Sequence, residues 1–240
     1  MDYDTDFVDG YQQISFGSLH FRHHHGGKKR LVFLHGLGGN TRAWSRLMQY
    51  MSGEFDIWLL DLLGHGGSDA PALEYNTNIQ FQALREFISI KNLVDSYIVG
   101  HSYGGWIAAF YASQHYASTC KGIVLIDAAG LQEEGMGDER KRVEEIKTLM
   151  KLNNNREHVI RSVFENVGEF RLGPKTLAEI KVPALIIWGA NDDITEKGYA
   201  DMFAERIANT SKTIIENAGH YPHYTNPEEV AKLITEFVSK

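Results

Sequence analysis

The sequence has little cysteine and no long apolar run, and each shortage excludes a class of protein. Cys120 is the only cysteine among 240 residues, so no intrachain disulfide can form and a reducing compartment is favoured. No segment approaches the roughly 20 consecutive apolar residues of a membrane-spanning helix. The chain starts with acidic residues, whereas a secretory signal starts with basic residues and an apolar stretch. We therefore expect a cytoplasmic protein with no membrane partner.

Basic residues are scarce relative to acidic ones. Lys and Arg number 24 against 31 Asp and Glu, which gives a formal net charge of −7. Nucleic-acid binding relies on clustered Lys and Arg that face phosphate, and the short basic run 28–30 is expected at a solvated hairpin end. The composition therefore predicts no nucleic-acid partner.

Short apolar runs alternate with helix-like segments along most of the chain. Continuous apolar runs are typical of strands covered on both faces, and regular alternation with helices indicates a mostly parallel sheet. The sequence thus predicts an α/β fold with about eight strands flanked by helices, opening with an antiparallel hairpin around Gly17-Ser18. Strands are predicted at 11–16, 19–24, 31–34, 55–60, 96–99, 122–126, 183–188 and 212–216, and helices at 41–51, 78–91, 103–115, 195–208 and 226–238.

The alternation stops after Gly130, and for about 50 residues the chain is polar and has no strand signal. Apolar residues at helical spacing, among them Leu149 and Met150, indicate one helix there, and residues 159–164 indicate a second, shorter one. We predict a single domain in which a helical cap, 130–178, interrupts a core formed by 1–129 and 179–240. An apolar underside of this cap would favour an apolar acyl or alcohol group in a substrate.

The pentapeptide Gly100-His101-Ser102-Tyr103-Gly104 joins a predicted strand to a predicted helix. A serine nucleophile on such a turn sits at positive φ, which requires neighbours that lack a Cβ atom. Gly100 and Gly104 meet that requirement. The pattern therefore predicts Ser102 as the nucleophile, whereas the plain alternative is a tight turn without chemistry.

A serine hydroxyl needs a general base and a carboxylate that orients the base. His220 and Asp192 each follow a predicted strand, so both lie at the sheet edge where ligands gather in open α/β folds. We predict the catalytic set Ser102, Asp192 and His220. Asp193 and Asp127 remain alternatives for the acid. The competing histidine, His223, is interpreted as a supporting or surface residue.

Four segments together resemble the α/β-hydrolase family over nearly the whole chain. The order Ser, Asp, His is also the one associated with this family. The four are His35-Gly36-Leu37-Gly38-Gly39, the run Asp61 to Ser68, the Ser102 pentapeptide, and Gly189 to Asp192 taken with Gly219-His220.

The resemblance implies that two backbone N–H groups, those of Leu37 and Tyr103, hold the oxyanion of the reaction. It implies no cofactor. The substrate is expected to contact Leu37 and Tyr103 as well as Leu149, Met150 and Tyr221.

The residues and the resemblance predict a serine hydrolase, in the first place a carboxylesterase for small to medium esters that forms an acyl-enzyme. The expected partner is a small-molecule ester, and the chain is expected as a monomer or homodimer. Alternatives are hydrolysis of a carbon–carbon bond, thioester, lactone or amino-terminal peptide bond, or a non-catalytic small-molecule receptor. Haloalkane dehalogenases and epoxide hydrolases of this fold have aspartate at the nucleophile position, so Ser102 argues against both.

Three consecutive histidines, His23 to His25, raise the question of a metal site. Adjacent strand residues point to opposite faces and cannot converge on one ion without a distant partner. No metal site is therefore expected.

Overall fold

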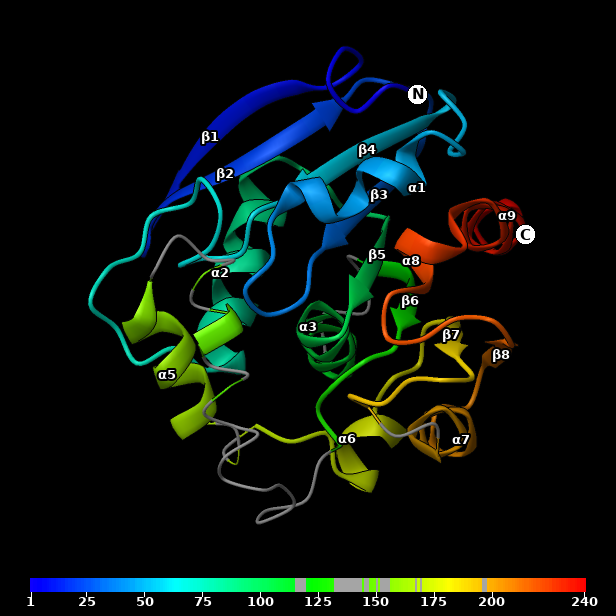
Figure 1. Cartoon of the computed structure of the whole chain (residues 1–240). Helices are drawn as coiled ribbons and strands as arrows, with labels where there is room; N and C mark the ends of the chain where they lie inside the picture. The colour runs from blue at the N-terminus through cyan, green and yellow to red at the C-terminus, as the bar shows by residue number, and fades with distance from the viewer. Residues whose placement is uncertain are drawn as a thin grey trace.

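An eight-stranded sheet runs through the molecule in the computed structural model, which describes residues 1–114, 120–131, 144, 147–149, 151, 156–166, 168, 170–195 and 198–240 (Figure 1). The strand order is β1-β2-β4-β3-β5-β6-β7-β8. β2 is antiparallel to β1 and β4, and the other neighbours are parallel. The predicted fold class is therefore confirmed. The strands are β1 Val8–Ile14, β2 Gly17–His24, β3 Lys29–Leu34, β4 Phe55–Leu60, β5 Ser96–His101, β6 Cys120–Ile126, β7 Ala184–Gly189 and β8 Thr210–Ile215.

Helices cover both faces of this sheet. The described ones are η1 Thr41–Trp44, α1 Ser45–Met48, α2 Thr77–Ile90, α3 Tyr103–Ser113, α5 Glu157–Glu165, α6 Pro174–Ala178, α7 Gly198–Arg206, α8 Pro222–Thr225 and α9 Pro227–Ser239. The sequence did not predict α6 and α8, which are only 5 and 4 residues long and begin with proline. No helix among the described residues is long and apolar enough to cross a membrane.

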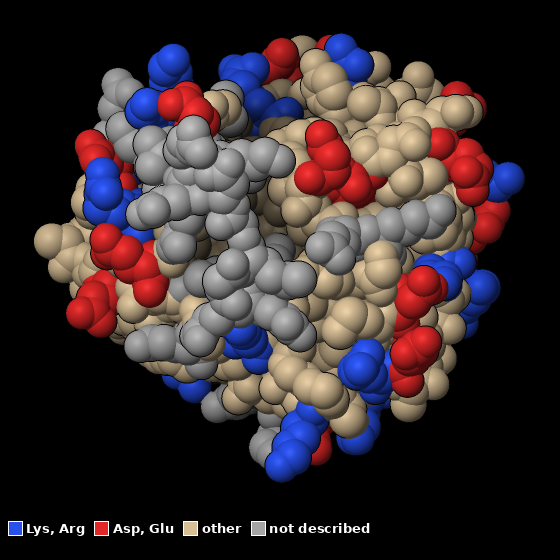
Figure 2. Space-filling model, turned by 60° about the horizontal axis from the view of Figure 1, so that its bottom comes forward, with Lys and Arg blue, Asp and Glu red and all other residues tan. Residues whose placement is uncertain are grey.

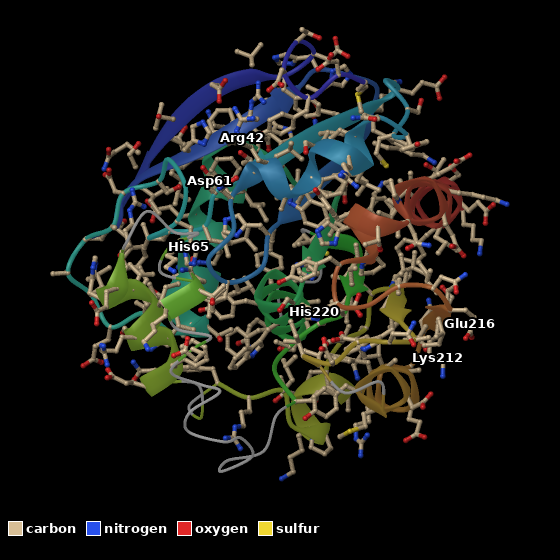
Figure 3. All side chains as sticks on the ribbon, viewed as in Figure 1. Arg42, Asp61, His65, Lys212, Glu216 and His220 are labelled. Atoms are coloured by element: carbon tan, nitrogen blue, oxygen red, sulfur yellow. The ribbon has the colours of Figure 1, made fainter. Side chains whose placement is uncertain are left out.

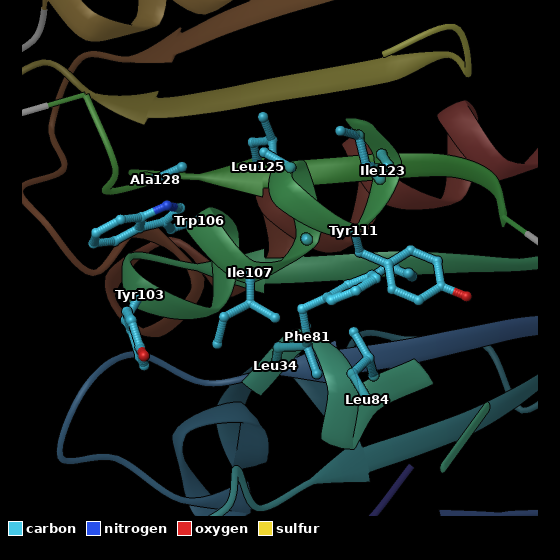
Figure 4. Packing of buried hydrophobic residues seen from close by; sticks show 14 of the residues in the cluster. Leu34, Phe81, Leu84, Tyr103, Trp106, Ile107, Tyr111, Ile123, Leu125 and Ala128 are labelled. Carbon is cyan, nitrogen blue, oxygen red and sulfur yellow. The ribbon is translucent and has the colours of Figure 1, made fainter. Parts of the chain in front are cut away.

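Alternate residues of the buried strands serve two separate cores. Val32 and Leu34 pack in the cluster that includes residues of α2, α3, α6 and α7. Leu31 and Phe33 pack in the other cluster, with residues of α1 and α9. Figure 4 shows part of the first cluster, to which Phe81 of α2, Ile107 of α3 and Leu125 of β6 all belong. The near-continuous apolar strands thus reflect a sheet covered on both sides.

The segment between β6 and β7 contains the residues that the sequence predicts as an insertion, and its domain boundaries stay a prediction. The predicted second helix corresponds to α5, whereas most of the first, including Met150, lies outside the described residues. Ser162 of α5 accepts a hydrogen bond from the Tyr75 N–H at 2.7 Å, and Arg156 donates to the Ser68 carbonyl at 2.8 Å. These bonds connect the insertion to the loop that follows β4. Its role as a cap stays a prediction.

The face that Figure 2 turns forward carries its charges in a mixed pattern. Among the residues drawn in colour, Lys and Arg lie mainly toward the rim and are interspersed with Asp and Glu. This distribution agrees with the acidic composition, in which basic side chains are in the minority.

Candidate active site

The turn between β5 and α3 has the strained backbone that the pentapeptide predicts. Ser102 has φ 50° and ψ −114° and precedes the first residue of α3. A Cβ atom on Gly100 would lie 2.3 Å from the Gly104 carbonyl oxygen, and one on Gly104 would lie 2.1 Å from the Leu34 carbonyl oxygen. Both glycines are therefore required by close backbone contacts, and the turn presents a partly exposed Ser102 at the end of β5.

His220 lies on the loop that joins β8 to α8, and its ring is 4.9 Å from that of His101 at the end of β5. Its Nδ1 forms a hydrogen bond of 2.9 Å with Oδ2 of Asp192, and the Asp192 side chain is fully buried. Asp193 is exposed, and no hydrogen bond joins it to His220 within the described part of the chain. Of the two adjacent carboxylates, the structure therefore brings Asp192 to His220.

The Asp192 carboxylate is surrounded by hydrogen-bond donors. Its Oδ1 accepts from the backbone N–H groups of Ile194 at 2.8 Å and Thr195 at 3.0 Å, and its Oδ2 accepts from the Thr195 hydroxyl at 2.5 Å. Burial by itself raises the pKa of this carboxyl, but hydrogen bonds from His220, Asp127 and Thr195 outweigh burial and hold the pKa below its usual range. Asp192 is therefore ionised and can orient an imidazole.

Asp127 lies beside this carboxylate and differs from it in protonation. It ends the β6 segment at φ 43°, and its Oδ1 accepts from the Gly189 N–H at 2.9 Å. Burial, together with the hydrogen bond to Asp192, raises the pKa of Asp127 to about 9. Asp127 is thus a neutral acid that donates to Asp192, and its hydrogen-bond partners do not include His220 among the described residues.

Two further histidines form a neutral layer beneath His220. His101 Nε2 donates to the His220 carbonyl oxygen at 2.7 Å, and the His223 ring lies 4.3 Å from the His101 ring. Burial, with the neighbouring histidines, lowers the pKa of His101 and lowers that of His223 to about 3. His223 is buried against Trp44, which excludes the surface position among the two interpretations of His223, and its supporting role stays a prediction.

The glycine-rich loop after β3 packs directly on the Ser102 turn. A Cβ atom on Gly36 would lie 3.3 Å from Ser102 Cβ and 2.9 Å from His101 Nδ1. His35 fixes this loop, because its Nε2 accepts from the Leu62 N–H at 3.1 Å and its Nδ1 donates to the Gly36 carbonyl at 2.7 Å. Gly36 therefore lies against Ser102 with Leu37 as the next residue of the loop, and Tyr103 follows Ser102 at the positive end of α3.

The Asp61 motif supports this arrangement from the loop after β4. The Asp61 carboxylate accepts from the N–H groups of Thr41 at 2.6 Å and Gly67 at 2.7 Å, and it contacts His20 Nδ1 at 2.8 Å. Asp61 and His65 lie on the same loop in Figure 3. Through these hydrogen bonds, Asp61 connects β2, the loop after β4 and the start of η1. The contribution of Asp61 is therefore structural.

Two of the remaining residues that were expected to contact substrate lie near the turn. A Cβ atom on Gly38 would lie 2.8 Å from Leu149 Cδ2, so Leu149 of the insertion packs on the glycine-rich loop. The Tyr221 ring lies 5.1 Å from the His220 ring and is 48% exposed. Their contact with substrate stays a prediction.

The arrangement offers a buried Asp–His pair next to a serine on a strained turn. No hydrogen bond joins the Ser102 hydroxyl to His220 in the described residues, and such bonds are often loose before substrate binds. Sequence analysis missed the bond from Thr195 to Asp192, because Thr195 was interpreted as the start of a helix. The spacing of Asp192 and Thr195 is typical of a turn in which an aspartate accepts from the residues that follow it.

Comparison with known proteins agrees with this architecture. The model of the alpha/beta hydrolase family matches residues 31–233. Among curated proteins, the chain is 24% identical to the monoacylglycerol lipase ABHD6 of Bos taurus, over 91% of this chain and 78% of that protein. It is 26% identical to Lipase 1 of Psychrobacter immobilis, over 84% of this chain and 74% of the lipase. The solved structure of esterase RhEst1 from Rhodococcus sp. ECU1013 superimposes with a TM-score of 0.81 at 17% identity, over 98% of this chain and 99% of the esterase.

Proposed function

Because the chain belongs to the alpha/beta hydrolase family, we propose that it is a serine carboxylesterase that cleaves small to medium carboxylic esters through an acyl-enzyme on Ser102. The observation that carries the proposal is the buried hydrogen bond between His220 and Asp192, next to a serine at φ 50°. These are the parts that nucleophilic catalysis by serine requires. Several proteins to which the chain is similar are lipases or esterases, which favours an ester bond.

In the proposed acylation step, His220 Nε2 takes the proton of the Ser102 hydroxyl as Oγ attacks the ester carbonyl. Asp192 holds the other ring nitrogen, Nδ1, in its protonated form and stabilises the imidazolium. The alcohol then leaves with the proton that His220 returns to it. The neutral His101 and His223 beneath the ring add no positive charge that would oppose proton uptake by His220.

The developing oxyanion would be held by the backbone N–H groups of Leu37 and Tyr103. The close contact between Gly36 and Ser102 and the position of Tyr103 at the start of α3 support this assignment. Loss of one such donor typically costs about 10² to 10³ in rate. In deacylation, His220 activates a water molecule that attacks the acyl carbonyl, and the acid is released with no cofactor.

The first test is hydrolysis of p-nitrophenyl esters from acetate to palmitate by the purified chain and by Ser102→Ala. We expect a rate that peaks at short or medium chains and falls at least about 10⁴-fold in Ser102→Ala. Asp192→Asn is expected to lose activity on a similar scale, since it leaves His220 in the wrong tautomer.

Asp193→Asn is the matched control, because Asp193 is the exposed neighbour of Asp192 and should retain nearly full activity. Near wild-type hydrolysis by Ser102→Ala would contradict the nucleophile. A larger loss in Asp193→Asn than in Asp192→Asn would move the acid by one residue. No hydrolysis of any ester by the wild type would favour a carbon–carbon, thioester, lactone or peptide bond, or a receptor.

A further inference from the structure

The three consecutive histidines at the end of β2 divide between the two faces of the sheet. His24 points to one face, where its ring nitrogens contact the carbonyl oxygens of Asp6 at 3.0 Å and Gly53 at 3.3 Å. His23 and His25 point to the other face, and their ring centroids are 3.8 Å apart. Two imidazoles of the run therefore share one site, and the third is engaged elsewhere.

Asp56 of β4 supplies the distant partner that the sequence did not show. In the antiparallel pairing of β2 and β4, His23 lies opposite Trp58 and His24 opposite Ile57, so Asp56 is the next β4 residue along. His23 Nε2 is 2.7 Å from Asp56 Oδ1. One ligand atom from each of His23, His25 and Asp56 lies within 4.8 Å of the other two. Strand pairing thus gathers two imidazole nitrogens and one carboxylate oxygen.

We propose that His23, His25 and Asp56 bind one zinc ion. Two imidazoles and a carboxylate are ligands that Zn²⁺ prefers, and water would complete a tetrahedral shell. The ion would take the place of the proton on His23 Nε2 that Asp56 accepts, and His23 would carry its proton on Nδ1 instead, so that it binds as a neutral imidazole. The partial exposure of the site, with His25 exposed and His23 buried, gives the ion access from solution.

Neighbouring side chains orient two of the three ligands. Trp58 Nε1 donates to the second carboxylate oxygen, Oδ2 of Asp56, at 3.2 Å, and the Trp58 ring stacks on His23 at 3.6 Å. Such outer contacts fix ligand orientation in metal sites. Arg30 Nε lies 3.8 Å from the same Oδ2 and competes for the carboxylate, but it leaves Oδ1 to the histidines.

The site lies far from the Ser102 turn. Asp56 is near the start of β4, whereas Ser102 follows the end of β5, and β3 pairs in parallel with both strands. An ion here would hold the end of β2 to the start of β4 and would not touch the proposed catalytic residues. The proposal is therefore independent of the proposed esterase activity.

Calorimetric titration of the tag-free whole chain with Zn²⁺ tests the site. We expect one ion per chain, and we expect His25→Ala to weaken binding at least about tenfold, since even outer partners of metal ligands are worth about 10–100-fold. His25 is exposed, so this variant should keep its fold, which circular dichroism in chelator checks. His24→Ala is the matched control, because it removes the adjacent histidine on the opposite face and should leave affinity within about twofold.

Fluorescence provides a second, local readout. Ni²⁺ prefers the same ligand types and quenches a nearby indole, so it should reduce Trp58 emission in the wild type and Zn²⁺ should reverse the effect. Trp58→Phe should lose this quenching, since Trp58 stacks on His23 whereas Trp44, Trp106 and Trp188 pack against Phe33, Tyr103 and Phe203.

Three outcomes would overturn the proposal. The first is no binding of Zn²⁺ up to millimolar concentration. The second is equal weakening by His24→Ala and His25→Ala, which would indicate a loose histidine run. The third is undiminished binding in His25→Ala, which would place the ion elsewhere, for example at the Asp127, Asp192 and His220 cluster.

Discussion

At the scale of single residues, the site depends on two carboxyl groups in opposite protonation states. Asp192 is kept ionised by its donors, whereas burial and the hydrogen bond to Asp192 raise the pKa of Asp127 to about 9. One shared proton therefore removes the repulsion that two buried carboxylates would suffer. Asp127, which the sequence suggested as an alternative acid, is a positioning group for Asp192 in the structure.

Asp127→Asn is predicted to change how stability depends on pH. Between pH 4 and 9, the folded wild type holds a proton on Asp127 that the unfolded chain has released, so this contribution to stability is lost as pH rises. Asparagine keeps an acceptor for the Gly189 N–H and a donor for Asp192 but does not titrate. The free energy of unfolding of the variant relative to wild type should therefore increase by up to about 1.4 kcal/mol per pH unit.

Urea unfolding at pH 5, 6.5 and 8 measures the difference in unfolding free energy between Asp127→Asn and wild type. Titratable groups that the substitution does not affect contribute equally to both proteins and cancel in this difference. Parallel stability curves for the two proteins would mean that Asp127 ionises at its ordinary pKa. That result would contradict the inference that Asp127 is protonated beside Asp192.

At the scale of elements, the junction of β5 and α3 combines a strained serine with glycines that allow close backbone contact. Ser102 holds a positive φ, and its carbonyl accepts from the N–H groups of Trp106 and Ala129, both at 3.0 Å. Gly104 lets α3 pack against the end of β3, within contact of the Leu34 and His35 carbonyls. The turn and the loop after β3 are therefore one packed unit.

Gly104→Ala is predicted to destabilise the fold by about 3 kcal/mol or more, because its Cβ would overlap backbone that cannot move aside. Gly198→Ala is the control, since a Cβ there meets nothing within 4 Å and alanine at an open helical position is neutral or stabilising by about 0.5–1 kcal/mol. Urea unfolding midpoints measure both. Equal stability of Gly104→Ala and wild type would contradict the close contact at this turn.

At the scale of the whole molecule, the chain between β6 and β7 contacts the loops that follow β3 and β4. Leu149 from the insertion packs on Gly38, and α5 is joined to the loop after β4 through Ser162 and Tyr75. We infer that the insertion limits the length of the acyl pocket. The expected placement in the cytoplasm and the expected monomer or homodimer stay predictions.

Leu149→Trp is predicted to shift the preference among esters toward shorter acyl chains, because a larger ring against Gly38 fills space near the turn. We expect kcat/KM for the longest accepted ester to fall about tenfold, with less effect on acetate. Lys147→Ala is the matched control, since Lys147 is an exposed residue of the same segment and pairs with Glu144 at the surface. Superimposable chain-length profiles for Leu149→Trp and wild type would exclude Leu149 from the pocket.

Much of the fold could be predicted from the chain itself, because its signals are local. The apolar run 55–60 predicts a buried strand, and the glycines around Ser102 predict a tight turn with close backbone contacts. The structure confirms both. The α6 and α8 helices were missed because a single turn after a proline has too few residues for periodicity. Thr195 was missed as a partner of Asp192 because its hydrogen bond depends on the fold of one loop.

The sequence by itself determined the strand-to-helix turn around Ser102 and the α/β architecture, since the first depends on neighbouring residues and the second on alternation along the chain. It left the choice among Asp192, Asp193 and Asp127 open. Only the tertiary structure showed that Asp192, and not Asp193, contacts His220. The two aspartates are adjacent and identical in type, and they differ only in burial and contacts, which the sequence does not specify. Only strand pairing brought Asp56 to His23 and His25. Contacts between distant segments depend on packing and register, which a linear pattern does not specify.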